Sequence, residues 1–367
     1  MKPKISTYQF FIMMVLLPYG SAVLFFLAPE NKQDAWIAMI IYSLSGIILQ
    51  LLYISLYNSY KEDTLITYLP KIYGKFLGNV FGILYILYFT YIGSRVVRDF
   101  LELINITGFK YTPMWVIGAT FMVVTIYGVS RGVETIASVS QAFFIAIISL
   151  PLLVGVLLIL SEDVFRISNL KPILQDGIIE VIKNGWPLIF FPYGETIVFT
   201  MFYPYINEQT KIKKVAVGSI IFEGIILSFV NILFICGLGV DLTVISICPF
   251  FQVVQRISVF EFLTRLDIIF VIILIIGGFF KITILMYAAV LGTVQITKIK
   301  NIKVFSLIFG MIIFILSLVI AESYLQHIEI GLEFVVKYVH TIFQIVIPLL
   351  TFILHYIRKI FYKPRKL

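Results

Sequence analysis

Charged residues are scarce in this sequence, and so are cysteine and histidine. Asp, Glu, Lys and Arg make up 13% of the 367 residues, whereas 60% are hydrophobic. Cys236 and Cys248 have no metal-ligand spacing, and neither do His327, His340 and His355. The sequence therefore indicates no disulfide framework and no metal site. So much apolar surface also excludes a soluble domain of ordinary composition.

The sequence also lacks the short motifs of common enzyme and nucleotide sites. It has no P-loop, no nucleophile elbow with a partner base, and no glycine-rich dinucleotide turn after a strand. The net charge of +8 is not gathered on a basic face with interleaved aromatic residues, so no nucleic acid partner is indicated. We predict no catalytic residues and no cofactor, and an integral-membrane enzyme is the least supported class.

Long apolar runs are what the sequence does contain. Runs of about 20 residues match the thickness of a bilayer core, and they predict an all-α polytopic membrane protein with about ten spans in one transmembrane domain over residues 1–367. The predicted spans are 8–28, 35–57, 76–104, 113–129, 141–160, 184–206, 215–240, 263–296, 303–322 and 335–358. The longer connections, 161–183 and 241–262, are expected on one side of the membrane, the second as a short amphipathic or re-entrant segment.

The lysines and arginines between spans predict the orientation in a bacterial cell membrane. They concentrate in alternate segments, for example at Lys71 and Lys75, at Lys213 and Lys214, and at Lys300. Positively charged loops are retained on the cytoplasmic side. Both termini are therefore expected in the cytoplasm, in agreement with an even number of spans.

A repeated tripeptide marks the centres of spans one and six. Pro-Tyr-Gly occurs at 18–20 and again at 192–194. Proline removes a backbone donor and glycine tolerates any backbone conformation, so we expect both helices to be broken there, at Gly20 to Ala22 and at Gly194 to Thr196. Pro and Gly also produce simple kinks in membrane helices. The matching positions favour a five-plus-five inverted repeat, with halves at 1–160 and 184–358.

Broken helices at membrane depth create a predicted ligand site, because irregular backbone survives there only beside a protein cavity. We expect the ligand carboxylate to meet N–H groups around Gly20, and its ammonium to meet carbonyls near Phe191. On this account Gly20→Val abolishes the response to ligand. The candidate binding residues are Tyr19, Gly20, Ser21, Ala22, Phe191, Pro192, Tyr193, Gly194, Glu195 and Thr196.

Ionisable residues inside the predicted spans are further candidates, because charges there are costly. Glu195 either contacts the ligand ammonium, or it has a structural role in which it caps broken-helix N–H groups or ties helices together. Lys281 in span eight either reaches the protein interior or snorkels to the headgroups. In span three, Arg95 with Asp99, and Arg98 with Glu102, are four residues apart. These pairs either close within one helix or form an outer gate.

The chain resembles the B subunits of bacterial spore germinant receptors, within the amino acid/polyamine/organocation transporter superfamily. The resemblance rests on the ten-span layout, the start Lys4-Ile5-Ser6-Thr7-Tyr8-Gln9, Phe-Pro-Tyr-Gly-Glu at 191–195, and Lys281 with Tyr287-Ala288-Ala289. It implies a LeuT-like fold, a pocket between spans one, three, six and eight, and residence in the spore inner membrane. It also implies A and C receptor subunits as partners, and it suggests that the Lys281 ammonium replaces a bound cation.

Two functions follow from these patterns. The first is a nutrient germinant receptor subunit that binds a small amino acid or similar ligand and triggers germination. The second is a secondary amino-acid transporter, coupled to protons or working by exchange. Both would use the same pocket, so the sequence leaves this choice open.

Overall fold

The computed structural model describes residues 4–108, 111–161, 164–258 and 266–361. These residues form helices, with one isolated parallel bridge between Ile5 and Ile206. The chain is thus an all-α polytopic membrane protein, which confirms the predicted fold class. The α-helices are α1 (Thr7–Leu16), α2 (Ala35–Ser59), α3 (Leu65–Tyr73), α4 (Lys75–Thr107), α5 (Met114–Ser130), α6 (Val133–Leu160), α7 (Gly177–Asn184), α8 (Ile212–Leu238), α9 (Val240–Ile245), α10 (Pro249–Arg256), α11 (Asp267–Thr297), α12 (Ile302–Val319), α13 (Tyr324–Glu329) and α14 (Ile347–Phe361).

Tighter or wider helices complete the fold within the described ranges. The 3-10 helices are η1 (Pro18–Gly20), η2 (Pro29–Asp34), η3 (Ile167–Leu170), η4 (Trp186–Ile189), η5 (Tyr193–Met201), η6 (Tyr203–Tyr205) and η7 (Gln209–Lys211). A π-helix, η8 (Ile330–Val346), joins α13 to α14. Among the described residues, seven helical segments are long and apolar enough to cross a membrane, and Thr7–Gly20 and Met114–Ser130 are shorter apolar helices. Each predicted span contains helix, but residues 21–28 of span one form turns and a loop, and residues 263–265 lie outside the described part.

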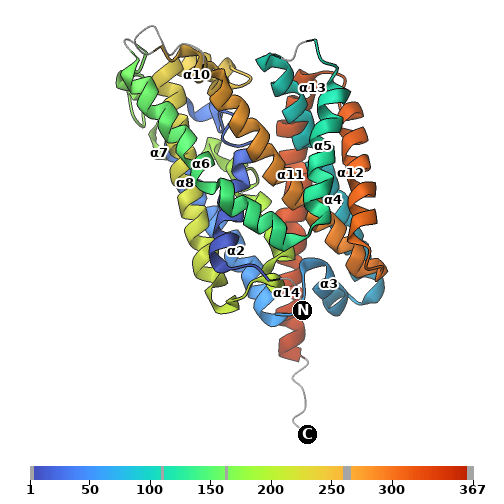
Figure 1. Ribbon diagram of the computed structural model, residues 1–367. Coiled ribbons are helices and arrows are strands. Elements are labelled where there is room, and N and C mark those ends of the chain that lie inside the picture. Colours follow the sequence, from blue (N-terminus) through green and yellow to red (C-terminus); the bar gives the residue numbers. More distant parts are fainter. Residues whose placement is uncertain (1–3, 109–110, 162–163, 259–265, 362–367) are drawn as a thin grey trace.

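The helices stand roughly side by side in one bundle (Figure 1). The start of α1 and the end of α14 lie at the same end of the bundle, and α10 and α13 lie at the opposite end. Spans three and eight, α4 and α11, pack along each other, and so do spans two and seven, α2 and α8. The interior helices α4, α8 and α11 have the most buried side chains. A helix that is buried in a bundle needs apolar residues on all its faces.

Span one leaves the α-helical form at the repeated tripeptide. Helix α1 ends at Leu16, and η1 and a series of turns follow it. No α-helix resumes before η2, so residues 21–28, which the sequence analysis included in span one, form no half-helix after the break. Pro18 explains where the helix stops, because it has no N–H to donate to the preceding turn.

Span six is not unwound at Gly194 to Thr196, which corrects that expectation. Those residues belong to the 3-10 helix η5 and are therefore wound more tightly than an α-helix. The hydroxyls of Thr196 and Thr200 each donate to the carbonyl three residues earlier, at 2.6 Å, which supports this tight winding. Pro192 again removes one N–H donor at the entry to the segment.

Span ten contains a proline whose missing donor is replaced by two tyrosines. An α-helical bond to Gln344 O, or a π-helical bond to Phe343 O, would need the N–H of residue 348, which is Pro348. Tyr53 Oη donates to Gln344 O at 2.6 Å, and Tyr85 Oη donates to Phe343 O at 2.7 Å. The missing N–H accounts for one of these carbonyls, and spans two and three supply a tyrosine donor to each of them.

Tyr85→Phe is expected to lower the free energy of unfolding by about 1–2 kcal/mol, because a buried carbonyl loses its donor. Pro348→Ala in the Tyr85→Phe background should recover part of this loss, since it restores an N–H at residue 348. Tyr111→Phe is the control, because Tyr111 is fully exposed. Thermal unfolding in detergent compares the unsubstituted chain, the three single variants and the double variant. If Pro348→Ala changes the free energy of unfolding equally in the unsubstituted chain and in Tyr85→Phe, the Tyr85 hydroxyl and the N–H of residue 348 do not substitute for each other.

Candidate functional site

A buried ion pair joins spans one, six and eight. Lys281 lies in the middle of α11, where its side chain is fully buried, and Glu195 lies at the start of η5, where its side chain is 6% exposed. Lys281 Nζ is 2.5 Å from Glu195 Oε2 and donates to Ser21 Oγ at 2.6 Å. The same ammonium lies 5.0 Å from the centroid of the Phe191 ring.

This geometry decides where the Lys281 side chain goes. It points into the protein beside the span-one break and does not snorkel toward the headgroups. Its partners come from the two segments that carry the Pro-Tyr-Gly repeat. A buried charge requires a partner at this depth, and Glu195 supplies it. Whether the ammonium stands in for a bound cation stays a prediction.

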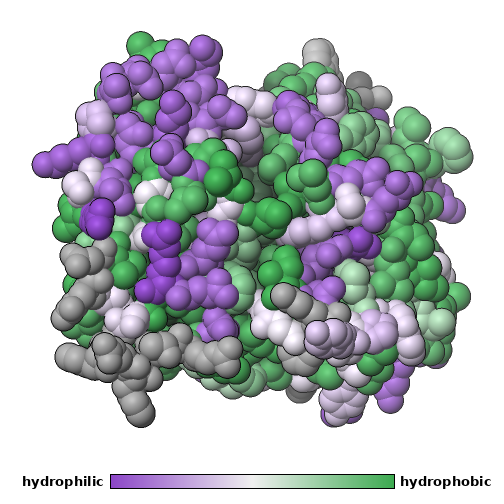
Figure 2. Space-filling model, turned by 90° about the horizontal axis from the view of Figure 1, so that it is seen from above, coloured by the Kyte–Doolittle hydropathy of each residue, from purple (hydrophilic) through white to green (hydrophobic). Residues whose placement is uncertain are grey.

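The ion pair lies at the base of a cavity of about 310 Å³ that is lined by residues from the α10 and α13 end of the bundle. Spans one, three, six, eight and ten contribute to its wall, together with the end of α9 and the residues that follow it. Figure 2 views the molecule from this end, where hydrophilic side chains gather on part of the face. The cavity is lined by Ser21, Phe25, Phe26, Leu27, Pro29, Ile92, Arg95, Val96, Asp99, Phe191, Glu195, Val244, Ile245, Ser246, Ile247, Lys281, Leu325, His327, Ile328, Gly331, Leu332, Val335, Val336 and His340.

The structure separates the predicted site residues into two groups. One group lines the cavity: Ser21, Phe191, Glu195, Lys281, Arg95 and Asp99. The other group lies outside this lining: Tyr19, Gly20, Ala22, Pro192, Tyr193, Gly194, Thr196 and Arg98. The cavity therefore lies beside the two Pro-Tyr-Gly segments, and most residues of these segments pack against other parts of the protein.

Gly20 and Gly194 serve close packing between spans. A Cβ on Gly20 would lie 2.3 Å from Lys281 Cβ and 2.9 Å from Gly277 O on α11. A Cβ on Gly194 would lie 2.0 Å from Gln344 Oε1 in span ten. Glycine is needed at both positions because a side chain has no room there.

Several groups expected to contact the ligand are already engaged within the protein. The N–H of Gly20 donates to Leu17 O, and that of Ser21 donates to Pro18 O. Tyr193 Oη donates to Met39 O at 2.6 Å. Tyr19 and Ala22 are both buried, at 1% exposure. A ligand carboxylate would have to displace existing hydrogen bonds to reach these N–H groups, which makes side chains its better partners.

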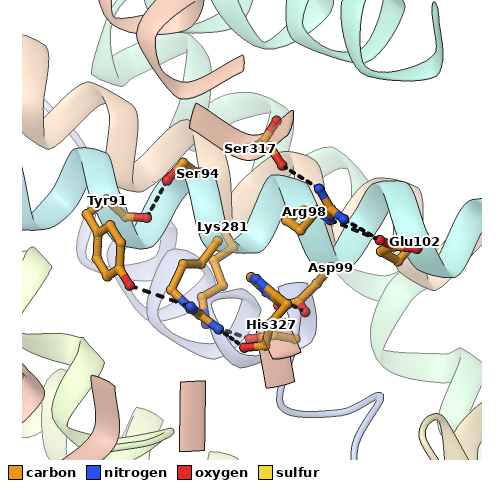
Figure 3. A network of polar contacts seen from close by, with 10 residues as sticks. Tyr91, Ser94, Arg98, Asp99, Glu102, Lys281, Ser317 and His327 are labelled. Carbon is orange, nitrogen blue, oxygen red and sulfur yellow. Dashed lines mark hydrogen bonds and ion pairs between the residues drawn. The ribbon is translucent and has the colours of Figure 1, made fainter. Parts of the chain in front are cut away.

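Of the two pairs that the spacing of charged residues on α4 suggested, one is formed and the other is not. Arg98 does pair with Glu102 on the same helix, with Nη2 2.8 Å from Oε1, and it also donates to carbonyls of α12 (Figure 3). Arg95 and Asp99 instead both turn to His327 of α13. Arg95 donates to the His327 carbonyl, and Asp99 Oδ1 lies 3.2 Å from His327 Nε2.

His327 and His340 are site residues that the sequence analysis missed. Both line the cavity, and His340 Nδ1 lies 2.8 Å from Tyr88 Oη. They lie far along the chain from their partners on α4, so no local spacing signals the contact. Within the described ranges, no group of three or more His, Cys, Asp or Glu side chains is placed to hold a metal ion.

Comparison with known sequences shows what kind of protein combines these features. The described residues form a helical membrane bundle with a cavity between its spans, which defines a polytopic membrane protein. Residues 4–325 match the family described as spore germination protein. The chain belongs to this family.

Similar curated proteins carry the same description. The chain is 36% identical to spore germination protein KB of Bacillus subtilis (strain 168) over 353 residues, which cover 96% of this chain and 94% of that protein. It is 27% identical to spore germination protein YndE of the same strain, over 86% of each chain. It is 22% identical to spore germination protein GerQB of Bacillus cereus, over 73% of each.

Proposed function

We propose that this chain is the ligand-sensing membrane subunit of a spore germinant receptor and that it binds a small nutrient, such as an amino acid, in the cavity above the Lys281–Glu195 pair. The observation that carries the proposal is the cavity itself. Its base holds a buried ion pair, and its walls are mostly apolar. Ligand sites combine apolar walls with a few placed polar groups in this way.

The arrangement of spans supports a LeuT-like inverted repeat of residues 1–160 and 184–358. Span one leaves the α-helical form at its Pro-Tyr-Gly, and span six is 3-10 helix before and after its copy. Spans two and seven pack together, and so do spans three and eight. These are corresponding members of the two halves, as a two-fold relation between repeats requires.

The proposal extends to the setting of the protein. Relatives include spore germination proteins A2 and B2 of Bacillus subtilis (strain 168). This supports the proposal that the chain works as one subunit of a receptor with several subunits. We assign the chain to the spore inner membrane, with both termini in the cytoplasm and with A and C receptor subunits as partners. Ligand binding in the cavity would shift the conformational equilibrium of the spans that line it, and the partner subunits would respond to that change.

Val336→Phe is expected to weaken ligand binding about tenfold or more by filling the cavity. Val336 lines the cavity and is 5% exposed. Val123→Phe is the matched control, because Val123 lies on α5 with 66% of its surface exposed and lines no part of the cavity. The full chain in lipid nanodiscs would be titrated with each of the L-amino acids. Unchanged affinity in a folded Val336→Phe chain would place the ligand elsewhere.

Flux measurements decide between sensing and transport. We expect proteoliposomes containing the full chain to bind the amino acid found above without accumulating it. Sustained uptake of the labelled amino acid, abolished by Val336→Phe and not by Val123→Phe, would contradict the sensor assignment and support a secondary transporter.

A further inference from the structure

The cavity contains one cation that lacks an ionised partner among the described residues. Four side chains of fixed charge line it: Arg95, Asp99, Glu195 and Lys281. Lys281 and Glu195 neutralise each other, and Asp99 lies beside His327. Within residues 4–108, 111–161, 164–258 and 266–361, no carboxylate lies within 4.0 Å of the Arg95 guanidinium.

The Arg95 guanidinium is buried and bonds only to neutral oxygens. Arg95 is 8% exposed, so it is more than nine-tenths buried. Nη1 donates to Tyr91 Oη at 3.5 Å, and Nη2 donates to the His327 carbonyl. A guanidinium carries five N–H donors, and taking its charge out of water is costly unless an anion compensates it. Arg95 is therefore prepared for an anion that the protein does not provide.

The surroundings fix the guanidinium in place before any ligand arrives. Tyr91 Oη on α4 accepts a hydrogen bond from Nη1, and the His327 carbonyl on α13 accepts one from Nη2. Gly331 makes room for it in span ten, because a Cβ there would lie 2.6 Å from Arg95 Nη2. A donor group held in position by its neighbours binds with less loss of side-chain freedom.

We propose that Arg95 binds the carboxylate of the ligand, and that the cavity thereby selects molecules with a free carboxylate. This assignment rests on the proposed function and deepens it. The planar fork of arginine matches a carboxylate with two parallel hydrogen bonds. Lys281 is not available for this role, because Glu195 and Ser21 already occupy its ammonium. Phe25, Phe26 and Val335 line the same cavity and leave apolar space for a compact side chain.

The first test compares each amino acid that binds with its C-terminal amide, on the full unsubstituted chain in nanodiscs. The amide has nearly the same size and keeps the ammonium but lacks the negative charge. We expect it to bind about 30-fold more weakly or worse, because it leaves the guanidinium without an anion. Equal affinity for acid and amide, or binding of a neutral hexose in place of any amino acid, would overturn the Arg95 assignment and leave the cavity as a binding site.

The second test asks whether Arg95 causes the preference. Arg95→Gln should bring the affinities for acid and amide together, and Arg95→Lys should keep a smaller preference. Arg98→Gln is the matched control, because Arg98 is one turn away, equally buried, and paired with Glu102 outside the cavity lining. It should leave the ratio of acid to amide affinity unchanged.

The ratio of acid to amide affinity separates ligand recognition by Arg95 from a purely structural role of this residue. If Arg95 only braced α13, its loss would weaken acid and amide alike, and a preserved ratio in Arg95→Gln would refute the proposal. If the folded unsubstituted chain bound no amino acid, amide or hexose at all, the proposed function would fail together with it.

Discussion

Lys281→Met is expected to destabilise the protein by about 3–5 kcal/mol and to abolish ligand binding. The substitution leaves the Glu195 carboxylate buried without its partner at 2.5 Å, and an uncompensated buried charge has a cost of this size. It also removes the donor to Ser21 and so loosens the base of the cavity. Thermal unfolding of the full chain in detergent measures the first effect, and titration with L-amino acids measures the second.

A second substitution separates charge from packing in this result. The double variant Lys281→Met with Glu195→Gln has no buried charge at this place, so it should recover most of the lost stability but not the binding. Lys211→Met is the control, since Lys211 pairs with Glu208 at a surface where both side chains are more than half exposed. Such exposed pairs contribute about 1 kcal/mol or less. A double variant as unstable as Lys281→Met would show that packing matters more than charge.

Gly277→Val is expected to reduce stability by about 3 kcal/mol or more and to lower the amount of inserted protein. A Cβ at residue 277 would lie 2.3 Å from Tyr19 O and 2.7 Å from Tyr19 C. These are backbone atoms, so the clash cannot be relieved by turning a side chain, and η1 would have to move away from α11. Small residues allow this kind of close helix contact inside membranes.

Gly218→Val on α8 is the control, because no atom lies within 4 Å of a Cβ built there. It should keep inserted protein and unfolding temperature close to those of the unsubstituted chain. Normal accumulation of Gly277→Val would mean that span one and α11 tolerate separation. The same reasoning changes the meaning of Gly20→Val. That substitution also clashes with α11, so a loss of response would report broken packing and not blocked access for a ligand.

The sequence predicted much of the membrane architecture because the relevant signals are local. An apolar run of about 20 residues determines a span whatever its neighbours are. The proline of the first Pro-Tyr-Gly copy likewise marks where span one leaves the α-helical form, since a missing N–H acts within one turn. Span six, in contrast, is 3-10 helix before and after its copy. The burial cost of a charge made Lys281 and Glu195 stand out in the same way.

The sequence analysis failed where a property depended on several distant segments. One of its two interpretations paired Arg95 with Asp99 on the same helix, whereas both contact His327 of α13. It expected a ligand carboxylate at the N–H groups around Gly20, and it did not foresee that α11 packs against this residue. The pairing of Tyr85 with Phe343 O could not be foreseen, because it requires knowing which span lies opposite Pro348.

The sequence by itself determined the class of protein, the positions of its spans and the residues whose charge demands a partner. Hydrophobicity, proline geometry and the cost of burying a charge act on single segments, and these can be read along the chain. Only the tertiary structure decided which partner each charged group has. It paired Lys281 with Glu195 and left the Arg95 guanidinium facing the cavity with neutral hydrogen-bond acceptors. It also placed Gly20 and Gly194 against neighbouring helices. The physical reason is that hydrogen bonds and steric contacts act over a few ångströms, so they depend on which segments the bundle brings together.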